Sequence, residues 1–255
     1  MRVVSAGRSQ SIQFDAYCGP APTPVDLSSA WNADPIAIGL ILILICLHRA
    51  TRLEGSTPLL LGALGLVILF LSPLCALTVA LFSARVLHHV LLVAVVAPLL
   101  AMAFPAVSRT RIPLGWLVAG HAALLWFWHV PGVYEAAVGA APLYWAMQAT
   151  LLGSAVPLWG RIFAPDTGAG PALLALLATA VQMGMLGALL TFARTPLYEI
   201  HLTTTLPFGL SPLQDQQLAG LIMWVPAMLP YFAAAVFLSA RRLAWAADSS
   251  QPGRP

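Results

Sequence analysis

Long apolar runs, each close to the thickness of a bilayer, constrain this chain more than any other feature of its sequence. A membrane-spanning helix needs about 20 apolar residues, and its backbone polar groups must find their partners within the helix. Seven runs reach or approach that length: Pro35–His48, Thr57–Thr78, Val86–Phe104, Pro113–His129, Leu143–Ile162, Pro171–Phe192 and Gln217–Ala240. We therefore predict an all-α fold, a polytopic membrane bundle of about seven transmembrane helices.

The composition supports a membrane protein and excludes several other classes. Hydrophobic residues make up 60% of the 255 residues and charged residues 8%, whereas soluble domains carry about 25% charged residues. The chain has no lysine, which excludes Schiff-base chemistry, and no basic stripe of the kind that binds nucleic acid. The motifs G-x-S-x-G, H-E-x-x-H and the P-loop are absent, so we expect no enzymatic activity.

Polar composition divides the chain into three parts. Residues 1–34 are rich in Pro and Ser and predict an irregular extracytoplasmic arm, residues 35–242 form the transmembrane domain, and residues 243–255 form a short tail. Cytoplasmic loops of membrane proteins are enriched in arginine and lysine. With the arm outside, the cytoplasmic side holds eight arginines and the other side four, one of them Arg85. We therefore predict a multi-pass protein of the cell (inner) membrane with a cytoplasmic C-terminus.

The three cysteines, Cys18, Cys46 and Cys75, are far apart and form no C-x-x-C motif. So low and odd a count predicts no disulfide framework. We interpret Cys46 and Cys75 as small apolar residues.

The most informative polar residues are two adjacent histidines, His88 and His89, inside the third run. An ionisable residue within a membrane is by default a candidate for function. In the predicted orientation the pair lies about one turn below the outer surface, and His129 reaches a similar depth. Imidazole, thioether and thiolate groups together favour copper, particularly Cu(I). The predicted metal ligands are therefore His88, His89, His129 and Cys18, and we do not expect haem.

Helical geometry limits how these residues can act. Neighbours on a helix point about 100° apart, so His88 and His89 cannot easily bind one ion together. For the same reason, at most one of Met183 and Met185 faces a given site. His129 follows Trp126 and Trp128, so membership of an aromatic belt at the membrane surface stays an equal alternative to ligation.

A polar block, Asp215-Gln216-Gln217, precedes the last run. A carboxylate with two amides at a helix start can cap free backbone N–H groups. It can equally orient a metal-binding histidine through a hydrogen bond.

Five segments of the sequence are specific enough to compare with known families: Gly187–Tyr198, Gly209–Pro226 with its Asp-Gln-Gln…Met-Trp block, Trp128–Ala137, Ser83–Leu100 and Tyr17-Cys18-Gly19-Pro20. These segments resemble the CtaG family of cytochrome c oxidase assembly proteins, the seven-helix membrane kind. The resemblance implies an accessory role in the maturation of a haem-copper terminal oxidase, whose subunits would be its partners within the lipid bilayer. It also implies copper handling on the outer side, with Asp215, Gln216, Gln217 and Trp224 supporting the ligands or the fold.

The chain departs from the family pattern at two places. The family's third span reads His-Met-x-Gln-His; here Arg85 replaces the first histidine, His88 replaces the glutamine, and His89 matches. The fifth span of the family often carries a Glu-His pair, where this chain has Gln148-Ala149.

Two other functions compete with oxidase assembly. A membrane redox protein could use His121, His89 and His129 as ligands for haem, or could bind quinol. A transporter would need polar groups that continue to the cytoplasmic side, and below Met183 that side is almost purely apolar.

Overall fold

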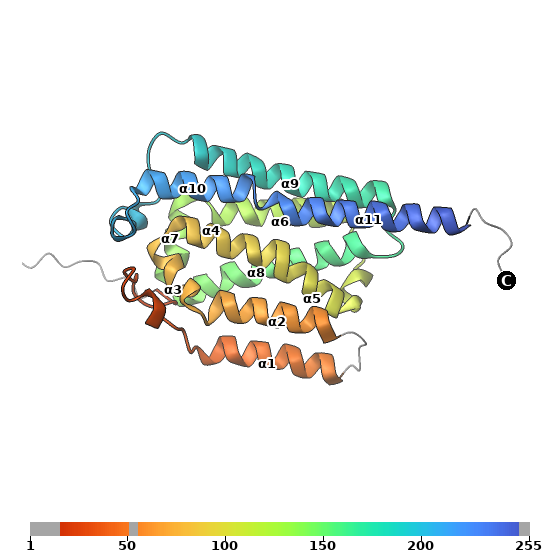
Figure 1. The fold of residues 1–255 in the computed structure, drawn as a ribbon, viewed down its shortest axis with the longest axis horizontal. Coiled ribbons are helices and arrows are strands. Elements are labelled where there is room, and N and C mark those ends of the chain that lie inside the picture. Colours follow the sequence, from red (N-terminus) through yellow and green to blue (C-terminus); the bar gives the residue numbers. More distant parts are fainter. Residues whose placement is uncertain (1–15, 51–55, 250–255) are drawn as a thin grey trace, which may run out of the picture.

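The computed structural model describes residues 16–50 and 56–249, which are helical wherever they are regular and contain no strand. Most of the helices lie side by side along one direction (Figure 1). The α-helices are α1 (Pro35–Ala50), α2 (Ser56–Phe70), α3 (Pro73–Ala80), α4 (Phe82–Leu91), α5 (Ala97–Ala103), α6 (Leu114–Trp128), α7 (Pro131–Gly139), α8 (Ala141–Phe163), α9 (Ala169–Phe192), α10 (Pro212–Trp224) and α11 (Met228–Ser249). A π-helical segment, η2 (Leu92–Val96), joins α4 to α5, and the 3-10 turns are η1 (Leu27–Ser29), η3 (Pro105–Arg109), η4 (Glu199–His201) and η5 (Leu206–Phe208).

The all-α fold is confirmed, and each of the seven predicted runs falls on helix. By length and composition, three helical stretches in the described residues could cross a membrane: Phe82–Ala103, Ala169–Phe192 and Pro212–Arg241. The pair Thr57–Phe70 and Pro73–Ala80, bent by 47°, would add a fourth. Helices α1 and α6 are apolar but shorter. Seven membrane spans and the direction of the termini therefore stay predictions.

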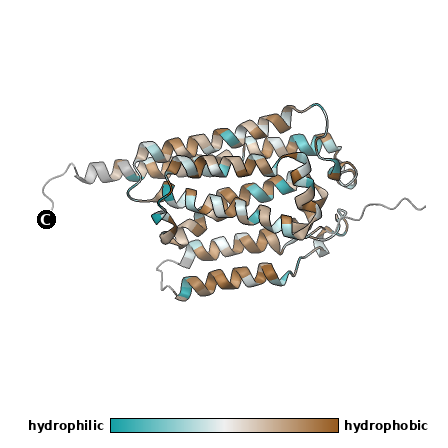
Figure 2. Cartoon of the chain, turned by 180° about the vertical axis from the view of Figure 1, so that it is seen from behind, coloured by the Kyte–Doolittle hydropathy of each residue, from teal (hydrophilic) through white to brown (hydrophobic). Residues whose placement is uncertain are grey.

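The bundle has two unlike ends. We call the end that carries residues 16–34, α7, η4 and η5 the arm end, and the opposite end, beyond which α11 projects, the tail end (Figure 1). Hydrophobic residues cover most of α1 and α2 at the edge of the bundle (Figure 2). Exposed leucine and isoleucine side chains on these helices, such as Leu42, Ile43 and Leu64, suit contact with lipid.

Proline explains the irregular centre of the long α4–α5 stretch. In the π-helical segment the Ala97 N–H bonds to the Leu92 carbonyl, five residues back. The next residue, Pro98, has no N–H to give to Val93. The Trp159 indole of α8 donates to the Val93 oxygen instead, at 2.8 Å. Tertiary packing thus satisfies a carbonyl that the local sequence leaves free.

Helices α9 and α10 approach each other through glycine. A Cβ atom on Gly220 would lie 2.5 Å from the Gly187 oxygen and 2.6 Å from the Thr191 nitrogen. Only glycine permits backbones to come this close. This contact brings the start of α10 against the end of α9 at the arm end.

Candidate functional site

The site begins where α3 ends and α4 starts, at the arm end. The first N–H groups of α4 have no capping side chain from their own segment. The Asp215 carboxylate of α10 takes that place: it accepts from the backbone N–H groups of Phe82 (2.6 Å) and Ser83 (3.2 Å) and from the Ser83 hydroxyl. A buried carboxylate therefore fixes the start of the helix that carries the two histidines.

The rest of the polar block fastens α10 to the segment after α9. Gln216 accepts from the Leu197 N–H at 2.7 Å, and the amides of Gln216 and Gln217 donate to carbonyls at the end of α9 and just beyond it. The start of α10 itself is capped by Ser211 and Gln214. The block thus does cap backbone N–H groups, but those of other segments. Trp224 is half-buried, and its ring meets the Phe192 ring edge to face.

Three of the predicted ligands form a buried row, which we call the histidine row: His88, His89 and His129. The ring centroids are 5.8 Å apart between His88 and His89 and 6.0 Å apart between His89 and His129. The two histidines of α4 diverge as helical geometry predicts: His88 meets the Phe70 ring edge to face, while the Gln148 amide of α8 contacts Nε2 of His89 at 3.3 Å.

Nδ1 of His89 has no hydrogen-bond partner within the described residues, and His88 makes no short hydrogen bond there, its ring having only a weak backbone contact with Leu69. Nδ1 of His129 donates to the Leu125 carbonyl at 2.7 Å, which leaves Nε2 as the nitrogen with the lone pair. The His129 ring is 6% exposed, so it lies inside the bundle and not in a surface belt of aromatic residues.

Aromatic side chains enclose the row on the side of the arm end. Phe82 stacks on Tyr198 with ring centroids 4.0 Å apart, and the Tyr198 hydroxyl donates to the His129 carbonyl. Tyr134 contacts Nε2 of His201 at 2.8 Å, and Nδ1 of that ring lies 3.3 Å from the Thr204 hydroxyl. Burial, with a smaller contribution from the Arg85 charge, lowers the pKa of His201 to about 3. His201 is therefore a neutral, hydrogen-bonded ring in the loop between α9 and α10.

Arg85 is the least expected residue of the site. We counted it as a loop charge, and this was wrong: it lies in α4 and its side chain is 1% exposed. Its Cζ atom is 5.1 Å from the centroid of the Tyr144 ring. Nε and Nη1 have no hydrogen-bond partner, and no carboxylate pairs with the guanidinium, among the residues that the structure describes. Without Arg85, the predicted cytoplasmic side has eight arginines and the other side three, so the distribution still favours the same orientation.

The prediction that the cysteines form no disulfide was also wrong. Cys18 of the arm is bonded to Cys75 of α3, with Cα atoms 5.4 Å apart across 57 positions of the sequence. Cys75 is therefore a bonded residue and not a simple apolar filler, whereas Cys46 is free and exposed. In the disulfide form Cys18 has no thiolate to offer to a metal ion.

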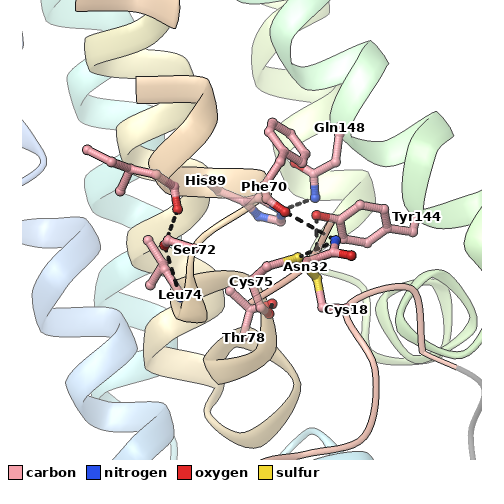
Figure 3. Close-up of a disulfide and its surroundings, with 11 residues drawn as sticks. Cys18, Asn32, Phe70, Ser72, Leu74, Cys75, Thr78, His89, Tyr144 and Gln148 are labelled. Carbon is pink, nitrogen blue, oxygen red and sulfur yellow. Dashed lines mark hydrogen bonds between the residues drawn. A yellow bond between two sulfur atoms is a disulfide. The ribbon is translucent and has the colours of Figure 1, made fainter. Parts of the chain in front are cut away.

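Figure 3 shows the disulfide beside Tyr144, Phe70 and the His89–Gln148 pair. The Tyr144 hydroxyl lies 3.8 Å from Sγ of Cys18, and the Asn32 amide nitrogen lies 3.6 Å from Sγ of Cys75. The arm, α3 and α8 thus meet directly beside the histidine row.

The remaining candidates lie elsewhere. His121 contacts the Ser154 hydroxyl at 2.8 Å, and His48 packs against Phe104. Met183 is buried whereas Met185 is 53% exposed, so only one of these two methionines faces the interior. Within residues 16–50 and 56–249, no three His, Cys, Asp or Glu side chains converge on one point that could hold a metal ion.

Sequence reasoning underestimated Gln148, Cys75 and Arg85. Gln148 and Arg85 stood out only as departures from a family pattern, and the pairing of Cys75 had no local signal. The useful signal was the spacing in α4, since Arg85 precedes His88 and His89 by three and four positions and such residues share a helix face.

Comparison with known proteins identifies the family. Residues 116–244, half of the chain, match the family of cytochrome c oxidase caa3 assembly factors. The match runs from α6 into α11 and includes His129, Gln148 and Asp215, while the histidines of α4 precede it. No curated protein and no solved structure matches the chain significantly. The family predicted from the sequence is confirmed: this chain belongs to the cytochrome c oxidase caa3 assembly factors.

Proposed function

We propose that this protein assists the maturation of a haem-copper oxidase by holding Cu(I) at the histidine row and passing it to an oxidase subunit. In this proposal the arm end faces the outside of the cytoplasmic membrane, as the arginine distribution favours. The protein transforms no substrate: copper is its cargo, and it uses no haem of its own.

The observation that carries the proposal is the incomplete hydrogen bonding of the imidazole nitrogens in the histidine row. Buried polar atoms in proteins nearly always have a hydrogen-bond partner, and an unpaired one calls for an explanation such as an ion. Here Nδ1 of His89 lacks a partner in the described part of the chain, and His88 has only a weak backbone contact with Leu69. Rings with centroids 6.0 Å apart, as in His89 and His129, leave room for an ion about 2 Å from a nitrogen of each.

The donor set also favours a monovalent copper ion over harder or more highly charged ions. A site without carboxylates offers little to calcium or magnesium, and the neighbouring Arg85 charge opposes a divalent cation more than a monovalent one. Cu(I) accepts neutral imidazole ligands and requires few of them. A site with few ligands suits a carrier that must release its ion.

The test is copper content together with oxidase activity. We expect protein purified in detergent after expression with added copper to bind Cu(I), and the His89→Ala/His129→Ala variant to lose at least half of it. Oxidase activity in membranes that contain this variant should fall by about tenfold or more. His121→Ala is the matched control, because His121 is a buried histidine bonded to Ser154 outside the row. A fully metallated, active oxidase in cells with the double variant would refute the proposal.

A further inference from the structure

We infer that Cys18 and Cys75, once reduced, form a second Cu(I) site: a pair of thiolates at an outer pocket beside the histidine row, with Arg85 as the compensating charge. The disulfide would close this site and the dithiol would open it. The inference rests on the proposed function, since the ion is the Cu(I) proposed there.

The first observation is access. A cavity of about 550 Å³ at the arm end is lined by Cys18, Gly19, Pro20, Asn32 and Ala76 among others. Cys18 is 8% exposed and Cys75 is fully buried. An external thiolate in the cavity would therefore meet Sγ of Cys18 and not Sγ of Cys75.

The surroundings of the two sulfurs suit that direction of attack. When a thiolate attacks Sγ of Cys18, the electron pair of the S–S bond leaves with Sγ of Cys75. The Asn32 amide nitrogen, 3.6 Å from that sulfur, can donate to the departing thiolate. A second thiolate of the same external donor then attacks the mixed disulfide and releases Cys18. The dithiol donor is oxidised to its disulfide, and the pair gains two electrons.

The second observation is the unpaired positive charge of Arg85. Its guanidinium is buried over the Tyr144 ring, and the hydroxyl of the same tyrosine lies 3.8 Å from Sγ of Cys18. In the disulfide form no described group neutralises this charge. Two thiols that bind Cu(I) release two protons and leave a complex with a net charge of −1. That complex supplies the anion that a buried guanidinium requires.

The position of the pair gives it a place in copper transfer. Figure 3 shows the two sulfurs on the arm side of Tyr144 and the His89–Gln148 pair next to that residue. Thiolates bind Cu(I) more tightly than imidazoles do, because both partners are soft. The cysteine pair would therefore be the tighter of the two neighbouring sites and would collect the ion that enters the pocket.

The test compares the native protein before and after reduction. Purified protein is divided, one half is treated with a phosphine reductant that is then removed, and both halves are titrated with Cu(I) supplied as its bathocuproine disulfonate complex. Maleimide labelling should count one thiol per chain before reduction and three after it. We expect reduced protein to bind one equivalent more than oxidised protein.

Three variants assign the extra equivalent. Cys46→Ser should behave as wild type, because this cysteine is free and exposed. Cys18→Ser/Cys75→Ser should bind the same amount before and after reduction. Arg85→Gln should weaken the reduced site by about tenfold or more, since it removes a charge held near the complex at low dielectric. The comparison on native protein decides the matter even if the double serine variant fails to fold.

The outcomes separate the two proposals. Equal binding by oxidised and reduced wild-type protein, or three labelled thiols before reduction, would overturn the cysteine site while leaving copper handling by the histidine row intact. The inference would be supported if Cys18→Ser/Cys75→Ser no longer bound the additional Cu(I) after reduction but still bound the Cu(I) that depends on His89. If no preparation bound Cu(I), both proposals would fail.

Discussion

The arm end and the tail end of this bundle are built from similar apolar helices, yet they hold their parts together in different ways. At the arm end, buried polar groups join segments far apart in the sequence: Asp215 caps α4, Gln216 holds the loop after α9, and a disulfide ties the arm to α3. At the tail end, an apolar cavity of about 570 Å³ lies among α5, α8 and α11. The one ion pair of the described residues, Arg161–Asp166, joins a half-buried arginine to an exposed aspartate at the surface there.

The difference shows which contacts fix the arrangement of the helices. Apolar contacts between membrane helices tolerate many arrangements, because lipid tails are as apolar as leucine. Buried hydrogen bonds to charged groups tolerate few arrangements, since a buried donor or acceptor left without its partner lowers the free energy of unfolding. We therefore expect the arm end, where the histidine row lies, to tolerate substitutions less well than the tail end. The predictions below test this contrast, in order of the expected effect.

The largest effect should come from Asp215. Replacing it with Ala leaves the Phe82 and Ser83 N–H groups without their acceptor, and we expect the free energy of unfolding in detergent to fall by about 3 to 5 kcal/mol. Asp215→Asn, which keeps the shape but not the charge, should lose less. Asp166→Ala, at the exposed ion pair of the tail end, is the control and should unfold as wild type does. Equal losses from Asp215→Ala and Asp166→Ala would remove the contrast between the ends.

A second effect should come from the contact of α9 with α10. Gly220→Ala would place a methyl group against the Thr191 hydroxyl oxygen and the backbone of α9. Such overpacking costs about 1 to 3 kcal/mol, which thermal unfolding followed by circular dichroism would detect. Gly153→Ala meets nothing within 4 Å and should be neutral or slightly stabilising. A neutral Gly220→Ala would mean that the helices can separate without loss.

A smaller effect should follow from Trp159→Phe in the tail half of the bundle. The substitution retains an aromatic ring against Tyr231 but removes the N–H that reaches the Val93 oxygen. One unsatisfied carbonyl should lower the free energy of unfolding by about 1 to 2 kcal/mol. Copper content should not change, because the histidine row is not involved. A loss of bound copper as large as that of His89→Ala would show that the two ends are coupled.

The smallest effect should be a pH dependence that His201 confers. Its pKa is lowered to about 3 in the fold, whereas the unfolded chain takes up a proton below about pH 6.5. Stability should therefore fall as the pH is lowered from 7 to 6, and His201 should account for about 0.7 kcal/mol of that loss. His201→Gln, measured by thermal unfolding at both pH values, should show a correspondingly smaller decrease. An identical decrease in both proteins would mean that His201 is protonated in the fold.

Much of the molecule was predictable because its signals are local. Apolar runs of membrane length predict helices wherever they occur, and the runs at Val86–Phe104 and Pro171–Phe192 coincide closely with helices of the structure. The divergence of His88 from His89 follows from the helical rotation alone. The family was also predictable, since the segment from Gly209 to Pro226 is a long and specific sequence motif.

Other features were not predictable because their partners are distant in the sequence. Cys18 and Cys75 are 57 positions apart, and Asp215 is separated from Ser83 by 132 positions. No periodicity links such residues. The error about Arg85 has the same origin. An arginine directly before an apolar run is typical of a loop, and only the contact with Tyr144, which is distant in the sequence, shows that Arg85 is buried in α4.

The sequence by itself determined that this chain is an all-helical protein with helices apolar enough for a membrane and that it belongs to a family of oxidase assembly factors, and it predicted a similar depth for His88, His89 and His129. These conclusions need only the composition, the rotation between neighbouring residues of a helix, and local sequence motifs. The tertiary structure alone decided which histidines share a row, that the cysteines pair, and that an arginine lies buried beside them without a carboxylate partner in the described residues. Those facts depend on contacts between segments that only folding brings together.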